Sequence, residues 1–411
     1  GISGTNAHVV LEEAPRAPEP MHAEGEQLLV LSARSEPALR ELAERYRAHL
    51  EATTDELADI CHTAAVGRNG FEHRVAVVAE HGRAAAESLA AFVAGRPAPA
   101  LVHGHGGRRP TVAFLFTGQG SQHVGMGREL LAREPVFRAA MERCAAALDS
   151  VLPRPMLEVL HPPTGAAVDD ALDQTLYTQP LLVALEWSLA QLWRAWGIEP
   201  DVVMGHSVGE YAAAIVAGVT SLEDGLRLVA ARARRMQALP AGGVMAAVNA
   251  DPGGVEEAVA EHGGGLVAVA AYNGPRSVVI SGQGLAVTRV LDALARRGIT
   301  ARRLVVSHAF HSPAIEPMLA GFAEDLAAVS LRPPRIPLVS NLSGTLATDE
   351  LASAEHWLRH TREAVAFARG MQALRDQGCD AFIEIGPQPT LLGLGRACVA
   401  EPEAQAWLPS L

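Results

Sequence analysis

Short apolar runs alternate with amphipathic stretches along most of the chain, and this pattern predicts the elements of an α/β fold. The apolar runs predict buried strands at Val112–Phe116, Asp201–Met204 and Ala381–Ile385. Apolar residues spaced three or four positions apart predict helices near 128–150, 180–196 and 221–237. Buried strands that alternate with helices are typical of a mostly parallel sheet with both faces covered. We therefore predict one such sheet, built from residues 110–240 and 306–396.

The pattern changes between residues 241 and 305, where short strands and helices follow in a different order. The predicted strands lie at 244–248, 266–271, 277–281 and 301–306, and the helices at 252–261 and 285–297. The order β-α-β-β-α-β is typical of a ferredoxin-like unit. We predict a small subdomain of that fold, inserted between the two parts of the large one.

The N-terminal part predicts a separate unit. Residues 1–12 combine a glycine-rich turn with an apolar strand, and a proline-rich linker follows at Ala14–Pro20, so we set 1–21 apart. An α+β domain is predicted over 22–109, with strands at 28–33 and 74–79 and helices after Ser35 and at 83–94. Ser35 has the position of a helix N-cap.

Composition narrows the class of protein. Of 411 residues, 49% are apolar and 19% charged, which is typical of a globular chain. The formal charge of −12 argues against nucleic acid as the main partner. Four cysteines far apart in sequence suggest reduced thiols in a cytoplasmic protein, with neither a zinc motif nor a disulfide framework. No apolar run has membrane-spanning length and no signal pattern is present, while a start without Met suggests a fragment or processed product.

The segment Gly205–Glu210 reads Gly-His-Ser-Val-Gly-Glu and joins a predicted strand to the helix-forming run Tyr211–Val216. Glycines on both sides of Ser207 let the backbone turn sharply and expose the hydroxyl. The start of the following helix offers unpaired N–H groups and a positive dipole end to a developing oxyanion. The segment therefore predicts a serine nucleophile for acyl transfer, and an ordinary surface serine between two glycines is the alternative.

A serine nucleophile needs a base within hydrogen-bond reach. Of 16 histidines, His308 and His311 stand out because they follow a predicted strand. A strand end on the sheet that bears Ser207 would bring one of them close to it. Spacing alone leaves two solvated loop histidines as an equal alternative.

The turn Gly118-Gln119-Gly120 follows another predicted strand. Its glycines would let the Gln119 side chain approach a reacting carbonyl as an oxyanion donor. A plain turn or a phosphate loop is the alternative. The turn lacks the lysine of a P-loop and the third glycine of a dinucleotide fingerprint, which disfavours nucleotide binding.

Arg232 lies beside the apolar face of the predicted helix that follows the serine segment. An arginine at such a buried edge would bind a substrate carboxylate through two hydrogen bonds. From spacing alone, an ordinary solvated basic face is the favoured interpretation.

Taken together, these motifs resemble the acyltransferase domain of modular type I polyketide synthases, within the malonyl-CoA:acyl-carrier-protein transacylase superfamily. The matching motifs, which occur in the family's order, are Gly118–Gln122, Gly205–Glu210, Ala231-Arg232, His308–His311 and Glu384–Pro387. The resemblance implies a hydrolase-like large subdomain at 110–240 and 306–396, with the ferredoxin-like insert at 241–305. Residues 1–21 resemble the end of a ketosynthase domain, 22–109 the ketosynthase-to-acyltransferase linker domain, and 397–411 the start of the post-acyltransferase linker.

The resemblance also implies roles for single residues. Ser207 matches the family nucleophile and His311 its general base, while Gln119 and the backbone N–H of Val208 match the oxyanion hole. Arg232 matches the arginine that binds the malonyl carboxylate. His360 matches the position that orients the catalytic imidazole through a main-chain carbonyl. The motifs further place His206, His308 and Phe310 beside the substrate.

The choice of substrate rests on the same motifs. His308–His311 read His-Ala-Phe-His, which the family associates with malonyl groups, whereas methylmalonyl-selective relatives usually have Tyr-Ala-Ser-His and a Gln in place of Val208. Phe310 would fill the space of a 2-methyl branch, a discrimination worth about 1–3 kcal/mol. Malonyl-CoA is predicted, with methylmalonyl or an unusual extender unit as the alternative.

The implied partners are malonyl-CoA, an acyl carrier protein and flanking synthase domains including the ketosynthase, in cytoplasmic polyketide antibiotic biosynthesis. Neither nucleic acid, membrane nor metal is implied, and no cofactor is bound, because phosphopantetheine arrives on coenzyme A and on the carrier protein. Arginines 234, 235, 296, 297, 302 and 303 are candidates for docking an acidic carrier protein. A serine hydrolase, which needs the order Ser, Asp or Glu, His, and a non-catalytic scaffold segment are the rival interpretations.

Overall fold

The computed structural model describes residues 8–13, 25–163 and 170–411. The chain divides into two compact units between Arg109 and Pro110. The predicted linker Ala14–Pro20 lies outside the described residues. The predicted N-terminal strand is described only from His8 onward, and residues 8–13 are exposed and form no strand, because no other described strand pairs with them.

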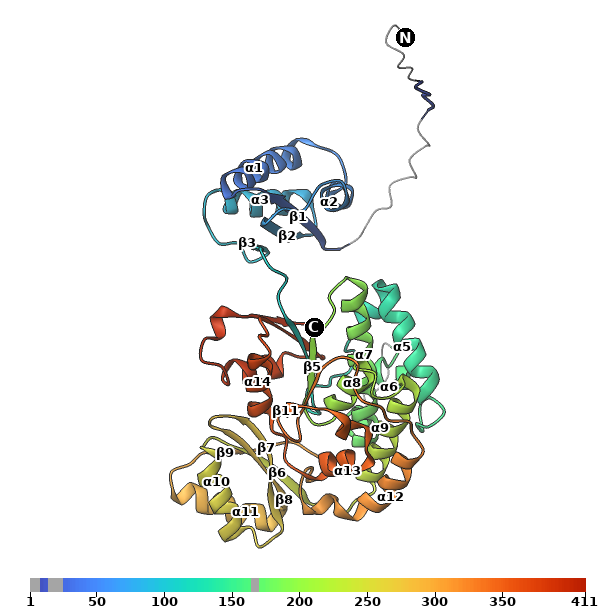
Figure 1. Ribbon diagram of the computed structural model, residues 1–411, viewed down its shortest axis with the longest axis vertical. Coiled ribbons are helices and arrows are strands. Elements are labelled where there is room, and N and C mark those ends of the chain that lie inside the picture. The colour runs from blue at the N-terminus through green and yellow to red at the C-terminus, as the bar shows by residue number, and fades with distance from the viewer. Residues whose placement is uncertain (1–7, 14–24, 164–169) are drawn as a thin grey trace. The chain divides into compact units, whose positions relative to one another are not determined.

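The N-terminal unit is an antiparallel sheet with three helices (Figure 1). Its strands pair in the order β1-β2-β3, with bounds β1 Gln27–Ala33, β2 His73–Ala79 and β3 Leu101–His105. Its helices are α1 Glu36–Ala52, α2 Leu57–Val66 and α3 Gly82–Val93. Ser35 caps α1 as predicted, since its hydroxyl accepts from the N–H of Ala38. The sequence pattern does not predict α2 or β3, and β3 is almost wholly exposed, so it lacks the alternation of a half-buried strand.

The second unit contains the predicted α/β sheet. Its six strands pair in the order β11-β10-β5-β4-β12-β13, and all neighbours are parallel except β10 and β11. The bounds are β4 Val112–Phe116, β5 Val202–Gly205, β10 Leu338–Ser340, β11 Thr345–Leu346, β12 Ala381–Ile385 and β13 Ala406–Pro409. The mostly parallel sheet predicted from the sequence is therefore confirmed.

The register of the central strands brings three motifs to one edge of the sheet. Strand β4 lies between β5 and β12, and Phe116 at its end is opposite both Gly205 and Ile385. Because the strands are parallel, the chain leaves all three at the same edge. The glutamine turn, the serine segment and the segment that begins at Gly386 are therefore neighbours.

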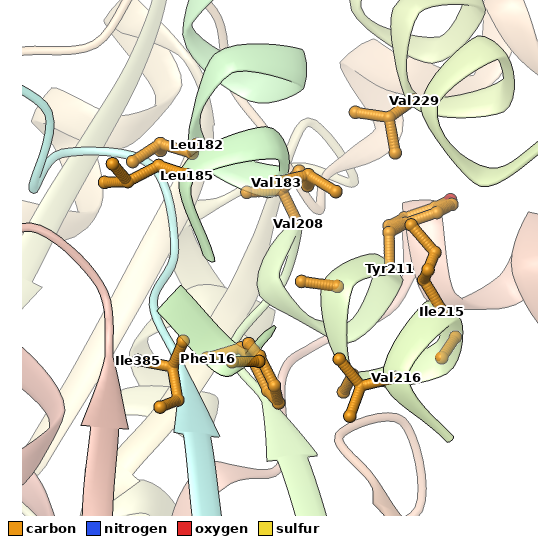
Figure 2. Close-up of a cluster of buried hydrophobic side chains, with 14 of the residues drawn as sticks. Phe116, Leu182, Val183, Leu185, Val208, Tyr211, Ile215, Val216, Val229 and Ile385 are labelled. Atoms are coloured by element: carbon orange, nitrogen blue, oxygen red, sulfur yellow. The ribbon is translucent and has the colours of Figure 1, made fainter. Parts of the chain in front are cut away.

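Helices pack on this sheet over a continuous apolar core. Their bounds are α4 Arg128–Arg133, α5 Pro135–Leu148, α6 Met156–Leu160, α7 Thr175–Ala195, α8 Gly209–Val216, α9 Leu222–Gln237, α12 Glu316–Ala327, α13 Ala354–Arg362, α14 Phe367–Asp376 and α15 Thr390–Arg396. The helix predicted over 128–150 is two helices, because Pro135 starts a new one. Figure 2 shows Val183 of α7, Val208 before α8 and Phe116 of β4 among the side chains of this core. None of the helices in the described ranges is long and apolar enough to cross a membrane.

The small subdomain has the predicted ferredoxin-like topology. Its elements are β6 Gly243–Val248, α10 Pro252–His262, β7 Val267–Gly274, β8 Ser277–Gln283, α11 Gly284–Arg296 and β9 Ala301–Arg303. The antiparallel strands pair in the order β7-β8-β6-β9, with both helices connecting strands of this sheet. Strand β9 ends three residues earlier than predicted, and the chain then leads back to the large subdomain.

The C-terminal residues complete the large sheet. Residues 397–411, which resemble a linker in the sequence, contain β13, and this strand pairs in parallel with β12. Trp407 of β13 stacks on Phe382 with ring centroids 4.4 Å apart. The segment is thus held to the sheet by both backbone pairing and an aromatic contact.

Candidate active site

The serine segment forms a sharp turn between β5 and α8, and its flanking glycines are required by close contacts. Ser207 has φ +52°, a left-handed backbone conformation that residues other than glycine rarely adopt. A Cβ on Gly205 would lie 2.1 Å from the backbone nitrogen of Glu210, and one on Gly209 would lie 2.3 Å from the carbonyl oxygen of Phe116. The turn therefore holds Ser207 in a strained position at the sheet edge.

His311 lies directly against this serine. Its Nε2 is 2.7 Å from the Ser207 Oγ, and its Nδ1 is 2.8 Å from the carbonyl oxygen of Glu363. A carbonyl only accepts hydrogen bonds, so Nδ1 carries the proton and donates it. Nε2 then has a free lone pair and accepts from the serine hydroxyl, which is the arrangement of a general base with its nucleophile.

The route by which His311 reaches Ser207 differs from the prediction. The strand before it, β9, pairs with β6 in the small sheet and not with the sheet that bears Ser207, so the predicted reason was wrong. The chain instead returns from the small subdomain and places His311 at the serine, again with a positive φ of +55°. His308 bonds the carbonyl of Leu239 at 3.2 Å, so of these two histidines His311 is the one that bonds the Ser207 hydroxyl.

The surroundings of His311 keep its imidazole neutral. Burial, together with the positive charge of Arg232, lowers the pKa of His311 to about 3. The hydrogen bond to the Glu363 carbonyl opposes this shift without cancelling it. A base with so low a pKa is unprotonated at every pH near neutrality.

Arg232 is buried, in contrast to the solvated basic face that its spacing favours. It is 1% exposed, its Nη1 donates to the Gln179 Oε1 at 2.6 Å, and its guanidinium lies 5.5 Å from the centre of the Tyr211 ring. Its Nε has no hydrogen-bond partner within the described ranges, and no carboxylate there offsets the burial that lowers its pKa. A buried cation without a carboxylate partner is costly, so an anion placed beside it would offset part of that cost.

A chain of hydrogen bonds leads from Arg232 to Gln119 and sets the orientation of both amides. A guanidinium can only donate, so Gln179 accepts with its oxygen and donates with its Nε2 to the Gln119 Oε1, 3.2 Å away. The Nε2 of Gln119 is thereby left as a donor. Sequence reasoning predicted Gln119 as a donor but missed Gln179, whose only signal is a polar residue within the apolar helix α7.

The other predicted site residues lie in the same region. Val208 is buried at the start of α8, and its N–H makes no hydrogen bond within the described part of the chain. His206 joins the two subdomains, since its Nε2 is 2.8 Å from the Oδ1 of Asn273 in β7, and burial lowers its pKa. Phe310 is buried next to the base.

The prediction for His360 needs a correction. The carbonyl that contacts His311 belongs to Glu363, three residues later, so the predicted position was wrong by about one helical turn. His360 is fully buried in α13, and burial lowers its pKa well below the usual range. Its Nε2 is instead 4.0 Å from the Oε2 of Glu210, a residue of the serine segment to which no role was assigned.

Metal ligands are not gathered anywhere in the described ranges, where no group of three or more His, Cys, Asp or Glu side chains could hold an ion. The geometry instead provides a serine with a neutral imidazole base, an amide donor beside a helix start, and an uncompensated buried cation. These groups are suited to transferring an acyl group that carries a negative charge.

Comparisons with known proteins agree with this chemistry. The acyl transferase domain family matches residues 113–408, and a family described as CurL-like, polyketide synthase C-terminal, matches residues 27–89. The chain is 44% identical over 98% of its length to the polyketide synthase GfsA of Streptomyces halstedii, but it spans only 6% of that protein.

Solved structures are similar over most of the chain. The acyltransferase domain from module 8 of the salinomycin polyketide synthase is 32% identical, with a TM-score of 0.84 over 93% of this chain and 90% of that one. The malonyl-CoA:acyl carrier protein transacylase of Xanthomonas oryzae is 34% identical, with a TM-score of 0.67 over 73% of this chain and 94% of that one.

Proposed function

The chain belongs to the acyl transferase domain family of modular polyketide synthases, and we propose that it moves a malonyl group from coenzyme A to an acyl carrier protein. The acceptor is the phosphopantetheine thiol of the carrier protein. The observation that carries this proposal is the Ser207–His311 hydrogen bond beside the buried Arg232, which pairs with no carboxylate of the described residues. In a larger synthase, the chain would act with a ketosynthase and other flanking domains.

The first half-reaction forms an ester on Ser207. The Nε2 of His311 takes the hydroxyl proton as Oγ attacks the thioester carbonyl of malonyl-CoA. The Nε2 of Gln119 and the N–H of Val208 donate to the oxyanion. The carbon–sulfur bond then breaks, and coenzyme A leaves as a thiol with the proton from His311. Arg232 binds the carboxylate of the malonyl group throughout.

In the second half-reaction a thiol is the nucleophile and Ser207 is the leaving group. His311 takes the proton from the carrier-protein thiol, whose sulfur attacks the ester carbonyl. The bond to the Ser207 Oγ breaks, and His311 returns the proton to the serine. Ping-pong kinetics follow from this sequence, because coenzyme A leaves before the carrier protein reacts.

Mass spectrometry of the Ser207 peptide tests the proposed function. After incubation with malonyl-CoA, we expect a malonyl ester on this peptide, because the neutral His311 activates Ser207. Addition of a carrier protein bearing phosphopantetheine should remove the malonyl group from Ser207 and place it on the carrier protein. Ser207→Ala is the control and should show neither product. Release of free malonate, with an unmodified carrier protein, would instead support a hydrolase.

The geometry at His311 weighs against the hydrolase alternative. In the serine hydrolases with that motif, an Asp or Glu carboxylate orients the histidine. Here the Nδ1 of His311 bonds a backbone carbonyl. The intact set of nucleophile, base, donor and cation likewise weighs against a purely structural scaffold.

The preference for malonyl should depend on Phe310. We expect Phe310→Ala to lower the ratio of malonyl to methylmalonyl loading by about 10-fold or more, because a smaller side chain leaves room for the 2-methyl branch. Competition between the two thioesters, read out on the Ser207 peptide, measures this ratio. Phe322→Ala, in a buried aromatic of α12, is the control for a general loss of packing. An equal loss of both substrates in Phe310→Ala would contradict the steric account.

Two of the six arginines predicted to contact the carrier protein are already in ion pairs within the chain. Arg235 pairs with Asp325, and Arg297 pairs with Glu257 and Glu261. Arg234, Arg296, Arg302 and Arg303 are exposed and form no ion pair with described residues. These four are the better candidates for contacting an acidic carrier protein.

A further inference from the structure

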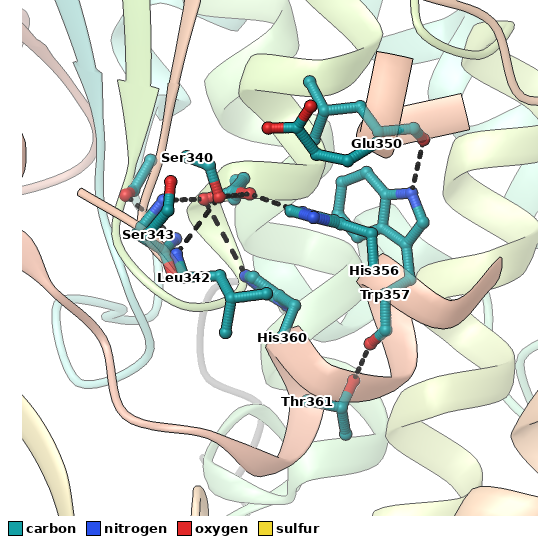
Figure 3. Close-up of polar contacts among 12 residues, drawn as sticks. Ser340, Leu342, Ser343, Glu350, His356, Trp357, His360 and Thr361 are labelled. Atoms are coloured by element: carbon teal, nitrogen blue, oxygen red, sulfur yellow. Dashed lines mark hydrogen bonds and ion pairs between the residues drawn. The ribbon is translucent and has the colours of Figure 1, made fainter. Parts of the chain in front are cut away.

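Glu210 is a buried carboxylate three residues after the nucleophile, and the proposed reaction does not use it. It is 0% exposed, in the first turn of α8. Its oxygens accept from the N–H of Asn341 at 2.5 Å, from the Ser340 hydroxyl at 3.3 Å and from the Nε2 of His356 at 3.3 Å. Figure 3 shows His356 and His360 on α13, with Ser340 nearby and dashed lines marking the contacts that both histidines make. A buried carboxylate with several donors is an anchor that resists displacement.

The donors belong to two segments, one on each side of Glu363 in the folded chain. The carbonyl of Glu363 accepts the hydrogen bond from the Nδ1 of His311. His356 lies in α13, the helix that ends just before Glu363. Asn341 follows β10, and its carbonyl accepts from the N–H of Ala366 at 2.6 Å, three residues after Glu363. Glu210 is therefore connected to the chain on both sides of the carbonyl that bonds His311.

The same anchor is connected to the nucleophile. Glu210 is in the helix that starts after Ser207, and the side-chain amide of Asn341 donates to the carbonyl of Gly205 at 3.1 Å. His360 fills the space between the anchor and the base, with its ring centroid 6.4 Å from that of His311. The Glu210 carboxylate is thus connected both to the segment of the nucleophile and to the segment whose carbonyl bonds the base.

The support has a chemical consequence for His311. Its Nε2 can accept from Ser207 only in the tautomer with the proton on Nδ1, and the Glu363 carbonyl selects that tautomer. A free imidazole side chain favours the proton on Nε2, where it would donate toward the serine and could not act as the base. Loss of the carbonyl contact would therefore remove the base without removing any atom of His311.

We propose that Glu210 is a positioning residue that holds the Glu363 carbonyl against His311 and thereby sets the tautomer of the base. The proposal concerns the same site and rests on the proposed function for its catalytic meaning. The tautomer itself is a property of the free protein and does not depend on any substrate.

Nitrogen NMR of the full chain labelled with ¹⁵N-histidine tests the proposal. The His311 signals are assigned by their loss in His311→Asn. In the parent protein we expect the proton on Nδ1, and in Glu210→Ala a shift of most of the population to the Nε2 form. The rate of Ser207 acylation by malonyl-CoA at saturation should fall about 10- to 100-fold in the same variant. An unchanged tautomer in folded Glu210→Ala would overturn the proposal.

Two further variants separate positioning from general damage. Glu210→Gln keeps the size and can still pair with Asn341 and His356, so it should retain the Nδ1 tautomer and lose less than about tenfold in rate. Glu384→Gln, at another buried carboxylate that caps α15, should leave the tautomer unchanged. If Glu210→Ala does not fold, His356→Leu removes one of the two connections and should give a partial shift. A tautomer shift in Glu384→Gln as large as that in Glu210→Ala would count against a specific role.

The two hypotheses can fail independently. If the parent protein forms no malonyl ester on Ser207, the proposed function is wrong, whichever tautomer His311 adopts. A parent protein that forms the ester, with acylation lost but the tautomer unchanged in Glu210→Ala, keeps the function and removes the positioning role.

Discussion

Replacing His311 with asparagine should slow the acylation of Ser207 by malonyl-CoA by about 10²- to 10⁴-fold. Asparagine still fills part of the space and can donate to the Glu363 carbonyl, but it cannot take the proton from the serine hydroxyl. Stopped-flow release of coenzyme A, monitored with a thiol reagent, measures this step. His161→Asn is the matched control, because His161 is another histidine whose pKa burial lowers, to about 4, and it is not hydrogen-bonded to Ser207.

The pH dependence of the parent protein tests the same assignment. Because burial and Arg232 lower the pKa of His311 to about 3, the base is unprotonated at higher pH. The acylation rate should therefore stay constant on the acid side from about pH 8 to about pH 5 and fall only as the pH approaches that pKa. A rate that halves near the ordinary histidine pKa of about 6.5 would show that the base is solvated, contrary to this geometry.

The parts of the site that are local in sequence can be predicted, and the parts that depend on packing cannot. The serine turn was predicted because its glycines, strand and helix lie within a few residues, and β4 and β12 because these fully buried strands are apolar at all positions except Glu384. The position of His311 depends on how the chain returns from the small subdomain, because the strand before it belongs to the small sheet and does not end at the sheet that bears Ser207. The resemblance, and not periodicity, singled out His311, the histidine that lies 2.7 Å from the Ser207 hydroxyl.

The roles of polar residues buried in apolar helices could not be predicted from the spacing of apolar residues. Arg232 lies at the edge of an apolar face, where spacing cannot distinguish a buried guanidinium from a solvated one. Gln179 and Glu210 stand within apolar runs, and only the partners that folding brings to them give them a role. The Glu363 carbonyl leaves no signal, because a backbone group is present at every position.

Replacing Arg232 with methionine should lower the rate of Ser207 acylation by malonyl-CoA by about 10²- to 10³-fold and change that by acetyl-CoA by less than about tenfold. Losing the partner of a desolvated charge costs about 2–5 kcal/mol, and acetyl-CoA has no carboxylate to lose. Rates with the two thioesters, measured on the same preparation, give this selectivity. Arg227→Met is the control, since Arg227 is on the same helix but is exposed and pairs with Asp224.

The same substitution should make the free protein more stable, and this separates a binding role from a structural one. No carboxylate in the described part of the chain pairs with the buried Arg232, and replacing buried charges with apolar groups of similar size often adds about 1–4 kcal/mol. The hydrogen bond lost by Gln179 offsets part of this gain. A higher midpoint of thermal unfolding, together with the loss of malonyl loading, would mean that the cation is kept for its ligand. A lower midpoint, with equal losses for both thioesters, would mean that Arg232 holds the fold and does not bind the carboxylate.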